Sequence, residues 1–292
     1  MAMLYNLTSD DSEHVERQIA QWKGKSFSDL DANEIEGVVN KFEFLPKPLA
    51  KKLNEFSRDP SSDYLLIKGG RFYAPENGYK KSDVASEMFL LSLAYRLGAP
   101  TVDPNHKNGD VIHDIYPREE DRHKQIGGNA EDFLFWHTEN AHEDPLPSYL
   151  SLACIRGDQN AETLLANITQ YPFTKNDLDL LGKKEYVISA DLAYASRQES
   201  TYAILTNIED PCFRFDPLYT TTQSKDAENL LDRMAEHFNS NAQRLILEAG
   251  DVLLVNNHIC CHARTKFKSN YDGKDRWIQR VIINEQTRKY EP

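Results

Sequence analysis

The sequence predicts a mainly β protein whose first third is helical. From about residue 110 to residue 284, short runs rich in β-branched and aromatic residues alternate with turn-forming residues. Residues 1–100 instead repeat apolar side chains at helical spacing. Several short strands separated by turns are typical of a sandwich or a barrel. The chain contains no internal repeat, low-complexity tract or linker, so residues 1–292 are expected to form a single domain.

The helical part is expected to contain four helices, at residues 9–22, 30–46, 48–57 and 81–100. Pro46 and Pro48 separate the second helix from the third, because proline cannot continue a helix. A further helix interrupts the strands at residues 226–241, where DAENLLDRMAEHFNSN is amphipathic.

The β part is expected to contain short strands within nine runs of sequence. These runs are 110–116, 132–139, 148–156, 185–190, 202–208, 212–216, 244–257, 258–265 and 276–284.

Composition narrows the class of protein. A net charge of −12 argues against a nucleic-acid partner, whose binding surface would be basic, and is compatible with a cationic substrate. No apolar run approaches the roughly 20 residues that cross a bilayer, and the polar N-terminus predicts no signal peptide. The four cysteines, Cys154, Cys212, Cys260 and Cys261, form no CxxC pair, so we expect reduced thiols in a cytoplasmic protein.

A histidine and a carboxylate end the strand-like run FLFWHTE, at His137 and Glu139. Two residues apart on an extended chain, their side chains would share one face. The composition gives about 1.4 His-x-Asp/Glu patterns by chance, and three occur, the others being His14-Glu16 and His142-Asp144. His14 lies in an expected helix, and His142 lies in a loop before a proline. Only His137 and Glu139 therefore have the context of a metal site.

A third ligand candidate lies in ILEAGDVLLVNNHICCHARTKF, residues 246–267. There, His262 closes a predicted strand. Two ligands from one strand end and one from a neighbouring strand form the 2-His-1-carboxylate triad of non-haem Fe(II) oxygenases, which leaves coordination positions open. The same residue types also suit zinc.

Arg276 follows His262 by fourteen residues in the segment YDGKDRWIQR. A guanidinium forms a two-pronged ion pair with a carboxylate, so Arg276 could hold the far end of a 2-oxo acid bound to the metal. Arg280 lies four residues further on and would face the same way in a strand. The alternative role for both arginines is surface salt bridging.

These three ordered motifs resemble the clavaminate synthase-like Fe(II)/2-oxoglutarate-dependent oxygenases, and within them the amino-acid hydroxylases. The resemblance extends from about Ser82 to Asn284. It implies a double-stranded β-helix, also called a jelly roll or cupin-like core, with flanking helices. It also implies Fe(II) held by His137, Glu139 and His262, with O2 and 2-oxoglutarate as co-substrates.

The resemblance further assigns residues to the co-substrate and the substrate. Arg276 would pair with the 2-oxoglutarate carboxylate; Thr163 would either assist it or cap a strand. Asp216 matches an aspartate that faces the substrate, and Arg280 matches an arginine that pairs with the substrate α-carboxylate. Glu139 would accept a hydrogen bond from the α-amino group.

A lid is expected at residues 105–130. Relatives often place a glutamine or a glutamate there to hold the substrate's α-amine, whereas this sequence has His106, Lys107 and Asn108. The departure leaves the α-amino contact unassigned.

The resemblance implies a hydroxylase of a free polar amino acid. Asp216 and the acidic chain favour a basic substrate such as lysine or arginine, with a neutral or carrier-bound amino acid as the alternative. Glu139 argues against a halogenase, because related halogenases have a small residue in its place. A non-catalytic jelly-roll binding protein and a zinc hydrolase are the alternatives from other classes. No nucleic-acid or membrane partner is expected, and homo-oligomerisation is left open.

Overall fold

The computed structural model describes residues 1–22, 30, 32–41, 43–72, 74–79, 84–101, 110–124, 128–190 and 200–285. The helices are α1 (Ser9–Gln21), α2 (Ala32–Lys41), α3 (Lys47–Arg58), α4 (Val84–Leu97), α5 (Lys175–Leu181) and α6 (Lys225–Asn241), with short 3-10 helices at Glu119–Asp121 and Ile168–Gln170. None of the helices in these ranges is long and apolar enough to cross a membrane.

Three sheets contain the strands. The large sheet has the order β1 (Met3–Asn6), β2 (Tyr64–Lys68), β12 (Val252–Asn256), β6 (Tyr149–Arg156), β14 (Trp277–Asn284) and β3 (Ala99–Pro100), with β4 (His113–Ile115) also paired to β14. The second sheet has the order β11 (Gln243–Leu245), β7 (Thr163–Asn167), β13 (Cys260–Arg264) and β5 (Leu134–His137). A small sheet joins β10 (Thr220–Thr221), β8 (Tyr186–Ile188) and β9 (Thr201–Tyr202).

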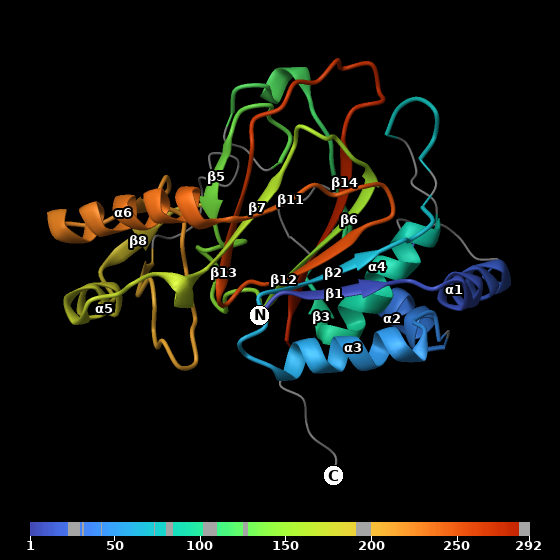
Figure 1. Cartoon of the computed structure of the whole chain (residues 1–292), viewed down its shortest axis with the longest axis horizontal. Helices are drawn as coiled ribbons and strands as arrows, with labels where there is room; N and C mark the ends of the chain where they lie inside the picture. The colour runs from blue at the N-terminus through green and yellow to red at the C-terminus, as the bar shows by residue number, and fades with distance from the viewer. Residues whose placement is uncertain are drawn as a thin grey trace, which may run out of the picture.

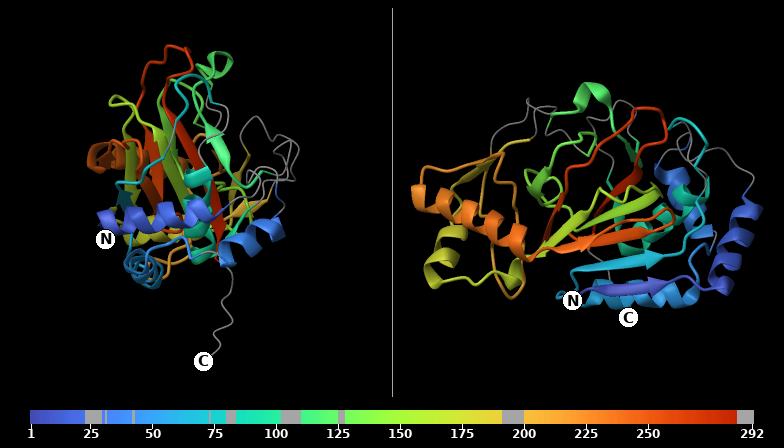
Figure 2. Two further views of the ribbon diagram at one scale, coloured as in Figure 1. Left: turned by 90° about the vertical axis from the view of Figure 1, so that its right-hand side faces the viewer. Right: turned by 45° about the horizontal axis from the view of Figure 1, so that its top comes forward.

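The large sheet is buried on both faces, and alternate residues of its central strands reach different cores. Leu152 and Leu253 belong to a core shared with the second sheet, whereas Ala153 and Leu254 pack with the N-terminal helices. This follows from the two-residue repeat of a strand. In Figures 1 and 2, α1 to α4 gather on one side of the sheets, and α5 and α6 lie at the other end.

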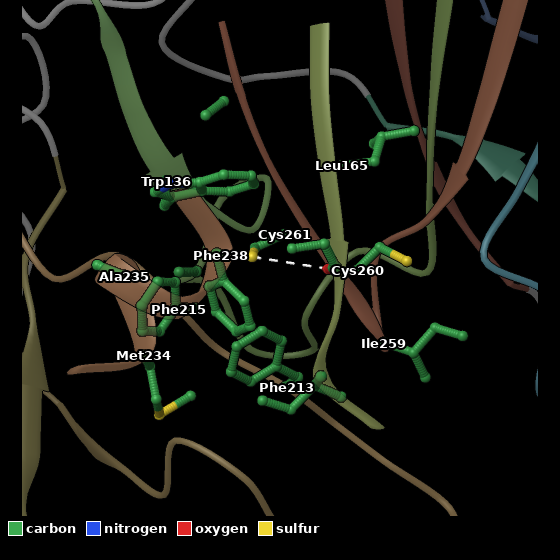
Figure 3. Packing of buried hydrophobic residues seen from close by; sticks show 14 of the residues in the cluster. Trp136, Leu165, Phe213, Phe215, Met234, Ala235, Phe238, Ile259, Cys260 and Cys261 are labelled. Atoms are coloured by element: carbon green, nitrogen blue, oxygen red, sulfur yellow. Dashed lines mark hydrogen bonds between the residues drawn. The ribbon is translucent and has the colours of Figure 1, made fainter. Parts of the chain in front are cut away.

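Helix α6 covers the second sheet with an apolar face. Met234 and Phe238 are fully or almost fully buried there against Trp136, Phe213 and Phe215, as Figure 3 shows. The Trp136 indole N–H donates a hydrogen bond of 2.7 Å to the Asn239 side chain, which ties α6 to β5. Helix α6 therefore supports the strand that ends at His137.

The predicted fold class is confirmed, but several elements differ from the expectation. The N-terminal third is not purely helical, since β1, β2 and β3 belong to the large sheet. Strand β7 and helix α5 were not predicted, although Thr174 and Asp177 form a capping box at the start of α5.

The strands expected at 202–208 and 212–216 are almost absent, with β9 and one bridge from Leu205 to Phe213 in their place. Their backbone groups bond elsewhere: Ile204 N–H donates to the Leu181 carbonyl, and Thr138 N–H donates to the Phe215 carbonyl.

Alternate side chains of the central strands pack against the N-terminal helices, so shortening one of them should destabilise the fold. Leu254 is fully buried, so Leu254→Ala should lower the free energy of unfolding by about 2–5 kcal/mol, measured by urea denaturation. Leu218, 49% exposed, offers a matched control, and Leu218→Ala should change stability by less than about 0.5 kcal/mol. Equal effects would contradict the assignment of Leu254 to the core.

Candidate metal centre

The second sheet brings His137 and His262 side by side. The two residues are direct partners in the antiparallel pairing of β5 with β13, and their ring centroids lie 4.2 Å apart. Directly opposite residues on one face of a sheet have adjacent side chains. One ligand atom each from His137, Glu139 and His262 lies within 4.8 Å of the others. The structure thus brings together the three residues predicted as ligands.

The prediction that a continuous strand places Glu139 beside His137 is wrong. Strand β5 ends at His137, and Glu139 lies in a turn before Asn140, whose φ is 49°. The fully buried Asn257 holds this turn: its side-chain oxygen accepts from Glu139 N–H at 2.8 Å, and its amide nitrogen donates to the Glu139 carbonyl at 3.0 Å. Asn257 also donates to the Pro147 carbonyl at 2.9 Å. It was not predicted as a site residue.

The donor set suits a divalent transition metal. His137 Nδ1 lies 2.7 Å from the Phe135 carbonyl, so this nitrogen carries the proton and Nε2 is available as a ligand. Burial, reinforced by the neighbouring His137 and the cationic Arg280, holds the pKa of His262 well below its ordinary value. A neutral imidazole is the form that binds a metal. Two imidazoles and one carboxylate match the facial triad of non-haem iron.

A cavity opens beside the triad. Its apolar wall comes from both sheets and includes Leu134, Leu152 and Ile278. Thr163, Arg276 and Arg280 line the same cavity, as predicted for residues of one site. The register of β14 against β6 is irregular between Trp277 and Ile278, and Arg276 itself precedes the strand.

Arg276 is a buried cation without a hydrogen-bonded acceptor among the residues that the structure describes. Burial lowers the pKa of its guanidinium. A buried charge of this kind is costly unless a partner of opposite sign binds it. Because Arg276 lines the cavity beside Thr163, the site fits a ligand with a carboxylate.

Arg264 also lines the cavity, although it was not predicted as a site residue. Burial and the nearby Arg276 lower the pKa of Arg264 to about 9. Its guanidinium donates to the carbonyls of Ala130 at 2.7 Å and Asp132 at 3.1 Å, which connects β13 to the segment before β5. Arg264 thus fastens together the two chain segments that carry the histidines.

Arg280 contacts Glu139 in the structure. Its Nη1 donates to Glu139 Oε1 at 2.8 Å, and its Nη2 lies 3.0 Å from Nδ1 of His113. Both partners are buried. His113 lies in the predicted lid segment and was not predicted as a site residue.

Asp216 is half-buried and is not one of the described residues that line the cavity. It follows Phe215, whose N–H donates to the Thr138 hydroxyl at 3.0 Å, so its backbone passes directly beside the triad. Two parts of the expected lid lie outside the described residues: 105–109, which includes His106, Lys107 and Asn108, and 125–127.

Asn257 provides a test of how the turn at Glu139 is held. Asn257→Ala removes one acceptor and two donated bonds from a fully buried site, so the free energy of unfolding should fall by about 2–4 kcal/mol. Asn270 lies exposed in a loop and provides the control, Asn270→Ala, which should be close to neutral. Urea denaturation of both variants measures the difference, and equal stabilities would rule out this role for Asn257.

Comparisons with known proteins show which proteins this chain resembles. A model of the family described as "Taurine catabolism dioxygenase TauD, TfdA family" matches residues 178–282. Enduracididine beta-hydroxylase from Streptomyces hygroscopicus is 23% identical over 97% of this chain and 95% of its own length. L-ornithine/L-arginine 3-hydroxylase from Catenulispora acidiphila is 22% identical over 97% and 94%. Clavaminate synthase 2 from Streptomyces clavuligerus is 28% identical over 82% and 79%.

Among solved structures, an asparagine oxygenase in complex with Fe(II), 3-hydroxyasparagine and succinate matches with a TM-score of 0.83. Sequence identity is 26%, over 96% of this chain and 93% of that one. The double-stranded β-helix implied by the sequence motifs is confirmed. The chain is a relative, over most of its length, of the amino-acid hydroxylases and clavaminate synthase among the Fe(II)/2-oxoglutarate-dependent oxygenases.

Proposed function

We propose that this protein is an Fe(II)/2-oxoglutarate-dependent hydroxylase of a free amino acid. One observation carries the proposal: a cluster of two histidines and a glutamate shares a cavity with the buried guanidinium of Arg276, which has no hydrogen-bonded acceptor in the described parts of the chain. The relatives named above include hydroxylases of amino acids, which agrees with this reaction. A zinc hydrolase or a non-catalytic binding protein is not favoured, because neither requires a free cation beside the metal.

His137, Glu139 and His262 would hold Fe(II), and Arg276 with Thr163 would hold the distal carboxylate of 2-oxoglutarate. Bound iron, with O2 and 2-oxoglutarate, supplies the oxidising power for C–H hydroxylation, with carbon dioxide and succinate as co-products. The protein's part is to orient one C–H bond and to exclude water. The apolar wall that includes Leu134, Leu152 and Ile278 serves the second purpose.

Substrate recognition is assigned to Arg280, Glu139 and Asp216. Arg280 Nε is buried and has no hydrogen-bond partner among the residues that the structure describes, so it could bind the substrate α-carboxylate. Glu139 would accept from the α-amine. Asp216 lies on the chain next to the triad and would select a basic side chain, in keeping with a relative that acts on ornithine and arginine.

The four cysteines are free thiols, and burial raises the pKa of Cys154 to about 12. Such thiols support the proposal that the enzyme works in the reducing cytoplasm.

Replacing a proposed ligand tests the reaction. His137→Ala, Glu139→Ala or His262→Ala should abolish the gain of one oxygen by the amino acid, measured by mass spectrometry with Fe(II), ascorbate and 2-oxoglutarate. His14→Ala, on helix α1, is the control and should keep full activity. Full turnover by any of the three variants would contradict the proposed triad.

Arg276→Gln tests the co-substrate site separately from the metal. Loss of a buried charge-assisted pair costs about 2–5 kcal/mol, so the KM for 2-oxoglutarate should rise by a factor of about 30 or more. Arg244, on the surface and paired with Glu162, provides the matched control Arg244→Gln. An unchanged KM for 2-oxoglutarate in Arg276→Gln would place the co-substrate elsewhere.

Asp216→Asn tests the choice of substrate. If Asp216 binds a cationic side chain, kcat/KM for lysine or arginine should fall by about tenfold or more, whereas that for a neutral amino acid should not fall. Asp210, which is exposed, gives the control Asp210→Asn. A proportional fall for every amino acid, or a wild-type enzyme that prefers asparagine, would remove Asp216 from this role.

A further inference from the structure

His113 and Arg280 are direct partners in the pairing of β4 with β14. Their side chains therefore project from neighbouring strands on the same face of the large sheet. Nδ1 of His113 lies 3.0 Å from Arg280 Nη2, and Nε2 of His113 lies 3.0 Å from the Asp110 carbonyl. His113 is only 4% exposed. Its ring is thus held at both nitrogens.

The contacts determine the form of this histidine. A guanidinium can only donate, so Nδ1 must accept and Nε2 must carry the proton that is donated to Asp110. The ring is therefore neutral, and Nη2 of Arg280 donates a hydrogen bond to it. The other terminal nitrogen, Nη1, donates to Glu139.

The ion pair with Arg280 uses only one carboxylate oxygen. Oε1 of Glu139 lies 2.8 Å from Arg280 Nη1, whereas Oε2 lies 3.6 Å from Nε2 of His262 and belongs to the predicted ligand cluster. A free arginine beside a carboxylate prefers the two-pronged geometry, in which parallel N–H donors take both oxygens. That arrangement would occupy the oxygen that a metal needs.

We propose that His113 is a positioning residue that prevents this two-pronged pair. By holding Nη2, it keeps Arg280 on Oε1 alone, which leaves Oε2 for the metal. It also leaves Nε, which has no partner within the described ranges, for the substrate carboxylate. This inference rests on the proposed function, since it concerns the same metal and substrate site. It assigns a specific task to a histidine in the lid segment.

Two variants separate this task from simple packing. His113→Phe keeps a ring of similar size and removes both nitrogens. His113→Gln keeps one acceptor for Arg280 and one donor for the Asp110 carbonyl. His123, which is 69% exposed and pairs with Asp132, provides the control His123→Phe.

Calorimetry measures the affinity of the metal-free protein for Co(II) alone, without oxygen. The melting temperature of each variant is recorded to show that it is folded. His113→Phe should bind Co(II) about tenfold more weakly, as expected when an outer-shell partner of a ligand is lost, while His113→Gln should stay within about threefold of wild type. In turnover, the KM for the amino acid should rise in His113→Phe more than kcat falls.

Wild-type Co(II) affinity in a folded His113→Phe variant would overturn the inference. So would a tenfold loss in His113→Gln, and this arm decides the matter if His113→Phe does not fold. If wild type binds Co(II) but hydroxylates no amino acid, the proposed function fails while the comparison of Co(II) affinities still stands. If wild type is active and the variants bind Co(II) alike, only the role of His113 is lost.

Discussion

The pairing of β5 with β13 is the constraint on which the centre depends, because it places His137 and His262 opposite each other. A slip of one residue in either strand would turn one imidazole to the other face of the sheet. Both faces of this pair are occupied, one by the cavity and the other by α6, so a slipped register would bury polar groups and expose apolar ones. The fold therefore specifies the histidine pair more strongly than any local contact does.

Charge in the cavity is unbalanced. Arg264, Arg276 and Arg280 line it, and Glu139 is the one carboxylate among the described lining residues. Arg280 satisfies that carboxylate, and backbone carbonyls satisfy part of Arg264, so Arg276 bears most of the imbalance. Binding of an anion in a cavity of this kind stabilises the folded state, so a co-substrate carboxylate held there would also stabilise the fold.

The sequence was most informative where function depends on residues close together in the chain. His137 and Glu139 stood at the end of an apolar run, and Arg276 followed His262 at a short distance, so pattern and order were sufficient to bring these residues into one site. Asn257 contacts Glu139 across 118 residues, and His113 meets Arg280 across 167. Nothing local marks such partners, because their roles arise only when distant strands align. The same reason explains β1 and β2, short runs that become strands by pairing with each other and with β12.

Helix α6 never reaches the cavity, yet it is attached to the centre one residue before His137, through the bond from Trp136 to Asn239. Helix α6 is thus hydrogen-bonded to the residue that precedes a proposed metal ligand. Sequence change on α6 would tune the centre from a distance without altering any group that touches a ligand. Substitutions on α6, natural or engineered, could therefore change the reactivity of this enzyme while every residue that lines the cavity stays the same.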